Sequence, residues 1–325
     1  MDPRVDAELA AHAGGDEEFV EAAFRLVLRR PPDDDARERA LAKLSEGTLS
    51  RATFLHELVS SDELRRVREL DDAVALGLGA RRRGERLTWL QAPGKTDERV
   101  VEIPWVLSRL RPSGRVLEVG YAFAETAWLG ALLRSGLELV GVDLATRDVE
   151  GMDTVEADVR DLPFPDRSFD QALLVSTLEH VGADNAVYGI EAAEGVGARR
   201  MALRELRRVL RRDGSLLVTV PVGEPGDHGW FRQEDERGWT SLFARAGWFV
   251  EESELYELRD EGWRATTSFR ADGVRYGERG PAASAVLCAQ LSPGRARHVL
   301  TPGGLRKATR RRAVRTYRRV RPRDL

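Results

Sequence analysis

The chain has 325 residues, enough for one large α/β domain and a smaller accessory unit at roughly 100–200 residues per domain. A formal charge of -3, with 42% hydrophobic and 32% charged residues, is typical of a soluble globular protein, and no window reaches the roughly 18 uninterrupted apolar residues of a membrane helix. The single cysteine, Cys288, excludes an intramolecular disulfide and a thiolate zinc cluster. The first residues lack the features of a signal peptide, so we expect a cytoplasmic protein.

Residues 16–70 are expected to be wholly helical. Apolar residues recur at spacings of three and four over 17–30, and Pro31 and Pro32 end that helix. Asp33 or Asp34 can cap the second helix, and Ser50 opens the third. A fourth helix, capped by Ser60 or Ser61, runs to about residue 78.

Three sequence segments resemble the small helical domain DUF4214: Phe19…Leu26-Val-Leu-Arg-Arg-Pro-Pro-Asp33, Gly47…Ser50-Arg51 and Ser60-Ser-Asp-Glu-Leu64. The resemblance covers about fifty residues and implies an accessory or interaction module over residues 1–80. Such modules often stand beside enzymes that build surface glycans. The resemblance therefore implies a protein partner for this helical domain.

Residues 81–96 are expected to form a linker, and 91–96 a loop rich in turn residues. A helix is predicted over 98–110, with Pro104 inside it as a source of a kink or a delayed start. Glu102 and Trp105 of this helix either line a ligand pocket or serve as a surface acid and a packing tryptophan.

From Arg115 onward, strands and helices alternate, which indicates a doubly wound parallel sheet. The expected strands are 116–119, 138–142, 154–157, 169–176, 215–220, 249–258 and 284–290. The expected helices between them are 124–135, 197–212 and 239–246.

Three acids, Glu118, Asp143 and Asp158, stand at the ends of the first three strands. The ligand crevice of an open α/β sheet lies outside the carboxyl ends of its strands, so these carboxylates are expected at one ligand site. Asp143 can accept hydrogen bonds from both ribose hydroxyls, and Asp158 with Val159 can meet an adenine edge. The turn after the first strand keeps only Gly120 of the glycine trio of a dinucleotide site, because Ala122 and Ala124 replace the others. This pattern favours a cationic nucleoside over a pyrophosphate.

An ordered set of motifs resembles the class I S-adenosylmethionine-dependent methyltransferases, and most closely their type 11 small-molecule enzymes. The motifs are Val116-Leu-Glu-Val-Gly-x-Ala-x-Ala124, Val142-Asp143, Ala157-Asp-Val-Arg-Asp-Leu-Pro-Phe164, Ser168-Phe-Asp170, Ser176-Thr-Leu-Glu-His-Val181 and the run from Leu206 to Pro221. The resemblance implies a Rossmann-like α/β domain over 97–294, with a seven-stranded sheet, an antiparallel last strand and helices on both faces. It also implies S-adenosyl-L-methionine as cofactor. The predicted cofactor-binding residues are Glu118, Gly120, Ala122, Asp143, Leu144, Asp158, Val159 and Ser176.

Methyl transfer to an alcohol needs alignment of the reacting atoms and a general base with a pKa near neutrality. His180, after the fourth strand, and His228, after the fifth, are the two candidates, and a third alternative is that neither is the base. No metal ion is predicted. Four acids could still bind a divalent cation, although they lack a fixed metal spacing: Asp184, Asp227, Glu234 and Asp235.

The sequence therefore predicts an S-adenosylmethionine-dependent O-methyltransferase that acts on a small polar acceptor, such as a sugar or glycan. The alternatives are an NAD-dependent oxidoreductase, which the alanines disfavour, and a non-catalytic scaffold that retains the fold. Residues 295–325 form a basic tail with a single acid, Asp324. Such a tail can contact a membrane surface peripherally or bind a partner, or it is a solvated helix. A nucleic-acid substrate is not favoured, because the chain has no Asn/Asp-Pro-Pro-aromatic motif.

Overall fold

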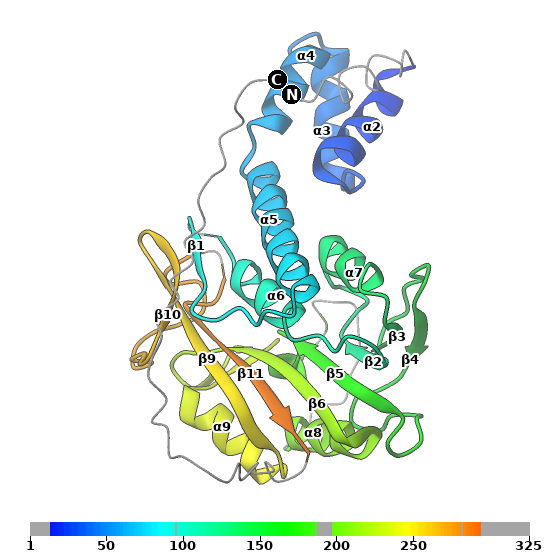
Figure 1. Cartoon of the computed structure of the whole chain (residues 1–325). Helices are drawn as coiled ribbons and strands as arrows, with labels where there is room; N and C mark the ends of the chain where they lie inside the picture. Colours follow the sequence, from blue (N-terminus) through cyan, green and yellow to red (C-terminus); the bar gives the residue numbers. More distant parts are fainter. Residues whose placement is uncertain (1–13, 95, 185, 187–196, 281, 294–325) are drawn as a thin grey trace. The chain divides into compact units, whose positions relative to one another are not determined.

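The computed structural model describes residues 14–94, 96–184, 186, 197–280 and 282–293 (Figure 1). The predicted basic tail lies outside the described residues, as does the segment 187–196 after the fourth strand. The chain divides into two compact units, residues 1–72 and 73–325, with the boundary inside one long helix.

The described part of the first unit is helical. It contains α2 (Asp16–Leu28), α3 (Asp34–Ser45), α4 (Arg51–Val59) and the beginning of α5 (Asp62–Arg82). Three predicted caps form: Asp33 accepts a hydrogen bond from the amide of Ala36 (2.8 Å), Ser50 accepts one from the amide of Thr53 (3.1 Å), and Ser61 accepts one from the amide of Leu64 (3.1 Å). The apolar residues of α2 pack on those of α3 and α4 to make a core of their own.

The second unit is built on a nine-stranded sheet in the order β1-β10-β9-β11-β6-β5-β2-β3-β4. Its strands are β1 (Gln91–Pro93), β2 (Arg115–Val119), β3 (Glu138–Asp143), β4 (Asp153–Glu156), β5 (Phe169–Val175), β6 (Leu210–Pro221), β9 (Phe249–Arg259), β10 (Gly262–Thr266) and β11 (Ala285–Ser292). β4, β3, β2, β5 and β6 are parallel, and β11 runs antiparallel between β6 and β9. The Rossmann-like α/β fold and the antiparallel last strand are thus confirmed.

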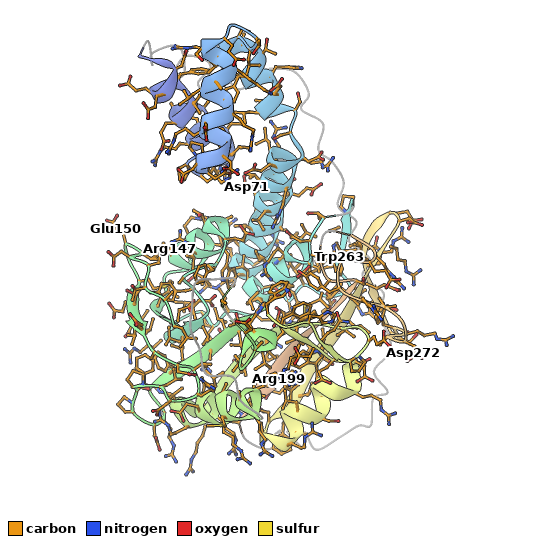
Figure 2. All side chains as sticks on the ribbon, turned by 180° about the vertical axis from the view of Figure 1, so that it is seen from behind. Asp71, Arg147, Glu150, Arg199, Trp263 and Asp272 are labelled. Atoms are coloured by element: carbon orange, nitrogen blue, oxygen red, sulfur yellow. The ribbon has the colours of Figure 1, made fainter. Side chains whose placement is uncertain are left out.

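The predicted number of seven strands is wrong, because β10 and β1 extend the sheet beyond β9. β10 turns back on β9 as a hairpin, and β1 pairs with β10, with Gln91 opposite Arg264. The prediction of a loop over residues 91–96 is therefore wrong for β1. This short strand exists only because β10 offers it an edge. Trp263 of β10, labelled in Figure 2, is fully buried and donates its indole N–H to the carbonyl of Thr96 (2.9 Å).

Helices cover both faces of this sheet. α6 (Arg99–Leu107) and α7 (Thr126–Leu133) lie over one face, and α8 (Ala198–Val209) and α9 (Glu236–Arg245) lie over the other (Figure 1). The central strands are buried on both faces, which is why they read as continuous apolar runs. Two small elements follow strands β5 and β6: a 3₁₀ turn, η1 (Leu178–His180), and a hairpin of β7 (Gly226–Asp227) and β8 (Arg232–Gln233).

The segment expected to be a linker packs within the second unit. Leu87, Leu90 and Ala92 are buried, and Arg81 at the end of α5 donates hydrogen bonds to the carbonyls of Ser135 and Arg111 (2.7 and 2.8 Å). Among the described residues, no helix is both long enough and apolar enough to cross a membrane.

Candidate functional site

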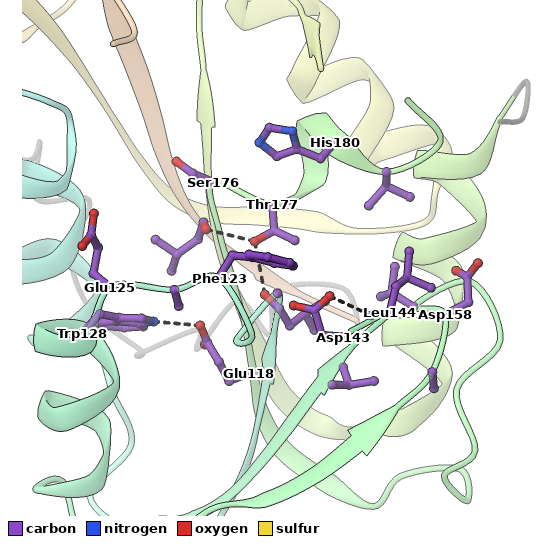
Figure 3. A pocket seen from close by; sticks show the side chains of 18 of the residues that line it. Glu118, Phe123, Glu125, Trp128, Asp143, Leu144, Asp158, Ser176, Thr177 and His180 are labelled. Carbon is purple, nitrogen blue, oxygen red and sulfur yellow. Dashed lines mark hydrogen bonds between the residues drawn. The ribbon is translucent and has the colours of Figure 1, made fainter. Parts of the chain in front are cut away.

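A pocket opens at the carboxyl ends of β2, β3 and β5 (Figure 3). Parallel strands deliver their following residues to this edge, where an open α/β sheet binds its ligands. Eight of the ten predicted site residues line the pocket: Glu118, Gly120, Asp143, Leu144, Asp158, Val159, Ser176 and His180. The two others, Ala122 and His228, are not among the lining residues.

The turn after β2 requires Gly120 for two reasons. Its φ of +88° lies in the left-handed region, which glycine adopts without strain. A Cβ atom at this position would also lie 2.7 Å from Oγ1 of Thr177, the residue that follows Ser176 after β5. The hydroxyl of Thr177 lies 3.2 Å from the carbonyl oxygen of Val119 and thus ties the ends of β5 and β2 together.

Asp143 is held by backbone amides on both sides. One carboxylate oxygen accepts from the amide of Ala122 (3.0 Å), and the other accepts from the amide of Leu144 (2.7 Å). Burial raises the pKa of Asp143, and these hydrogen bonds oppose that shift. Ala122 thus acts on the site through its backbone, which explains why a methyl group is tolerated where a dinucleotide turn has glycine.

Asp158 stands at the opposite end of the pocket from Glu118, as Figure 3 shows. Nε of Arg160 donates to both of its carboxylate oxygens (2.9 and 2.8 Å), and the Arg160 amide adds a third bond (2.8 Å). Burial alone would raise the pKa of Asp158, but the Arg160 hydrogen bonds outweigh burial and hold that pKa below its usual range. Asp158 is therefore an ionised acceptor of fixed orientation beside Val159.

Glu118 is a buried acid, 2% exposed, and only one of its two carboxyl oxygens has a hydrogen-bond partner. Oε1 accepts the indole N–H of Trp128 (2.7 Å), whereas buried Oε2 has no hydrogen-bond partner. Burial raises the pKa of Glu118 to about 8, although the Trp128 hydrogen bond and the charge of Arg99 oppose the shift. A buried carboxyl oxygen without a partner is costly, and a cationic group in the pocket would satisfy it.

Ser176 connects the pocket to α6. Its backbone adopts a φ of +43°, unusual for a residue with a side chain. Its hydroxyl donates to Oε1 of Glu102 (2.9 Å), and Oε2 of Glu102 accepts from Arg99 (2.5 Å). Glu102 is fully buried, so the interpretation as a surface acid is wrong, while Trp105 is a fully buried packing residue. Arg99 itself lines the pocket.

The two candidate bases have different surroundings. His180, in η1, lines the pocket, stacks on Trp230 with 5.1 Å between ring centroids, and places Nδ1 2.9 Å from the Trp230 carbonyl oxygen. A carbonyl can only accept, so Nδ1 carries the proton and Nε2 is the basic nitrogen. Burial lowers the pKa of His180. His228 instead stacks on Phe231 (4.5 Å), with Nε2 buried and without a hydrogen-bond partner.

The four acids considered for a metal ion have structural partners. Asp184 accepts from the amide of Ala186, Asp227 pairs with Arg232, Glu234 pairs with Arg199, and Asp235 caps α9 at the amide of Gly238. Across residues 14–293 outside the gaps, the structure contains no group of three or more His, Cys, Asp or Glu side chains arranged to hold a metal ion.

The lining residues that sequence reasoning did not predict include Arg99, Phe123 and Thr177. Arg99 stands one helical turn before Glu102, so the spacing of three could have indicated the ion pair. Phe123 lies inside the turn motif that the sequence singled out, but an aromatic residue there matches no glycine pattern. Thr177 carries no signal by itself, because its role depends on the approach of β5 to β2.

Part of the second unit is similar to a known protein family. Residues 117–218 match the family model Methyltransf_11, a methyltransferase domain. This match supports a class I methyltransferase with S-adenosylmethionine as its cofactor. No curated protein matches the chain.

Many solved structures are similar to the chain at low identity. One is the 1,6-didemethyltoxoflavin-N1-methyltransferase of Burkholderia thailandensis with bound 1,6-didemethyltoxoflavin and S-adenosylhomocysteine (20% identity, 55% of this chain and 71% of that chain, TM-score 0.39). Another is a Thermotoga maritima methyltransferase described as a possible histamine N-methyltransferase (18%, 71% and 93%, TM-score 0.40). A third is an S-adenosylmethionine-dependent methyltransferase of Methanosarcina mazei (13%, 58% and 96%, TM-score 0.40). At these TM-scores the likeness carries no argument about the acceptor.

The residues of the pocket fit S-adenosylmethionine. The partnerless oxygen of Glu118 would suit the ammonium of the methionine end, and each oxygen of Asp143, which already accepts from one backbone amide, would still be able to accept from a ribose hydroxyl. Asp158 and Val159 suit the adenine edge. S-adenosylmethionine has no pyrophosphate, so the pocket does not need the backbone amides and cationic side chains that bind a pyrophosphate.

Proposed function

We propose that this protein transfers a methyl group from S-adenosylmethionine to a hydroxyl of a small polar acceptor, such as a sugar or glycan, with His180 as the general base. One observation carries the proposal. His180 lines the same pocket as Glu118, Asp143 and Asp158, and the Trp230 carbonyl holds its imidazole in the tautomer whose basic nitrogen is Nε2.

The geometry of the pocket supports a set of proposed cofactor-binding roles. Asp143 would bind the ribose, Asp158 and Val159 the adenine, and Glu118 the ammonium of the methionine end. Arg99 would bind the carboxylate of that end, since it lines the pocket while sharing its charge with buried Glu102. When bound, S-adenosylmethionine supplies an electrophilic methyl group on a positively charged sulfur.

The catalytic requirement on the chain is small. The nucleophile must be aligned with the methyl group, and the acceptor hydroxyl must lose its proton. Burial lowers the pKa of His180, so the imidazole is neutral and able to accept that proton near neutral pH. Stacking on Trp230 and the hydrogen bond from Nδ1 hold the ring in one orientation.

The surroundings of His180 favour a ring-shaped polar acceptor. Trp230, Phe231 and Tyr276 form an aromatic cluster, with centroid distances of 4.7 Å for Trp230–Phe231 and 4.8 Å for Phe231–Tyr276. Phe231 is buried, so the rings that could stack on the apolar face of a sugar are those of half-buried Trp230 and Tyr276. The resemblance of residues 19–64 to modules found beside glycan enzymes points the same way.

The organisation proposed for the rest of the chain follows the sequence. Residues 1–80 would be an accessory domain that binds a protein partner, and the basic tail over 295–325 would contact a membrane surface peripherally. A cytoplasmic location is part of the same proposal.

The test is an assay of methyl transfer to a panel of nucleotide sugars and oligosaccharides, in which the S-adenosylhomocysteine formed is measured. His180→Asn keeps a nitrogen donor for the Trp230 carbonyl but removes the base, so turnover should fall by about 100-fold or more while affinity for S-adenosylhomocysteine is unchanged. His228→Asn is the matched control and should retain turnover. Full turnover in His180→Asn would remove His180 from the mechanism. Methylation of amines but of no hydroxyl acceptor would refute the proposed acceptor class.

A further inference from the structure

The turn between β2 and α7 presents one large apolar side chain to the pocket. Phe123 is 53% exposed, more than any other large hydrophobic residue among the described residues, and its ring lines the pocket. Figure 3 shows it projecting from the turn into the space between the Glu118 side and the Asp143 side. A phenylalanine on a short turn is normally packed against the core. Here Tyr121, two residues earlier, takes that buried place.

The neighbouring backbone explains why the two aromatic residues differ. Tyr121 is fully buried against Gly141 of β3, where an added Cβ atom would lie 2.8 Å from its ring, and its hydroxyl accepts from the amide of Arg147 (3.2 Å). Tyr121 thus anchors the turn. Phe123 is directed to the ligand side by the same backbone, so its exposure is a consequence of where the turn is fixed.

The carboxyl groups around Phe123 suit a cation. Glu118 and Asp143 both line the pocket, and Glu118 keeps a buried oxygen without a hydrogen-bond partner. The two lining arginines are paired with acids, Arg99 with Glu102 and Arg160 with Asp158. An aromatic face beside partly unsatisfied carboxyls is the chemistry with which proteins recognise a desolvated cation.

We infer that Phe123 recognises the positively charged sulfur of the cofactor through the face of its ring, and so distinguishes S-adenosylmethionine from the neutral product S-adenosylhomocysteine. This inference rests on the proposed function. With the ribose at Asp143 and the ammonium at Glu118, the sulfur lies between these groups, and Phe123 is the pocket residue whose turn joins them. The ring attracts the methylated, cationic cofactor and loses that attraction once the methyl group has left, which favours release of the product.

The experiment compares the affinities of both ligands by calorimetry in the absence of acceptor. In Phe123→Leu, which keeps an apolar side chain but removes the ring, the preference for S-adenosylmethionine over S-adenosylhomocysteine should fall by about 3- to 30-fold. Phe123→Tyr should keep the parent preference. Phe249→Leu replaces another exposed phenylalanine, at the start of β9 (40% exposed) and outside the pocket lining, and should change neither affinity.

Two outcomes would overturn the inference. If Phe123→Leu weakens both ligands by the same factor, Phe123 is a hydrophobic cover with no preference for charge. If Phe123→Leu changes neither affinity, its ring does not contact the ligand. Failure of the proposed function gives a different result: a parent protein that does not use this cofactor binds neither ligand, whereas one that methylates a different acceptor still binds both.

Discussion

The burial of Glu118 predicts opposite effects of one substitution on stability and on cofactor binding. The pKa of this carboxyl is raised by burial from 4.5 to about 8 in the folded chain. Between these values the folded state keeps a proton that the unfolded state releases. Folding stability therefore falls as the pH rises, by up to about 1.4 kcal/mol per pH unit, and the loss levels off above about pH 8.

Glu118→Gln removes this proton linkage and keeps an oxygen that can accept from Trp128. The variant's free energy of unfolding, relative to the parent, should therefore rise by about 2 kcal/mol between pH 6 and pH 8. The buried amide of the variant still lacks one hydrogen-bond partner, which lowers its free energy of unfolding by about 1–3 kcal/mol at every pH. The test is therefore how the difference between variant and parent changes with pH, and not its value at one pH. The same variant should bind S-adenosylhomocysteine more weakly, because a neutral amide replaces the partner of the ammonium.

Urea titrations monitored by tryptophan fluorescence measure this difference in the free energy of unfolding between variant and parent. All seven tryptophans lie in the second unit, so the signal reports on the unit that contains Glu118. Burial also raises the pKa of Glu98 to about 7 and of Glu179 to about 8, and comparison of variant with parent at each pH cancels their contributions. Glu156→Gln, at an exposed position in β4, is the matched control. A variant-to-parent difference that stays constant from pH 6 to pH 8 would refute the reasoning.

Two further predictions concern the pocket walls. Gly120→Ala should destabilise the second unit by about 2–4 kcal/mol, from backbone strain plus the contact with Thr177, whereas Gly136→Ala, also at positive φ but with open space around it, should cost about 1 kcal/mol. Adding Thr177→Ala to Gly120→Ala should recover most of the difference between the two costs. Equal costs at the two glycines in urea titrations would contradict this prediction. Arg99→Met should cost about 3–5 kcal/mol by leaving Glu102 buried without its partner. Adding Glu102→Gln should restore most of that stability but not the affinity for S-adenosylhomocysteine measured by calorimetry; restored affinity would show that Arg99 only supports the fold.

Much of the parallel sheet and of the pocket could be predicted because the signals are local. An apolar run followed by an acid places Glu118, Asp143 and Asp158 at one edge of a parallel sheet, whatever else the chain does. The alternation of strands and helices from Arg115 onward sets the α/β class for the same reason.

The edge of the sheet and the wall of the pocket depend on residues that are distant in sequence. β1 is a strand only where β10 pairs with it, and its three residues alone read as a loop. Glu102 reads as a surface acid until Ser176 and Arg99 meet it in the interior. His180 and His228 are equivalent in sequence, each beside an acid and after a strand, and only packing puts His180 in the pocket lining.

The sequence by itself determined the fold class, the cofactor and the three acids, because each depends on a short pattern of burial and charge within one strand and its turn. The tertiary structure decided which side chains line the pocket. Phe123 and Tyr121 stand two residues apart on the same turn, and the space beside Gly141 buries one while the other lines the pocket. Such a choice depends on packing between strands, which no local pattern contains.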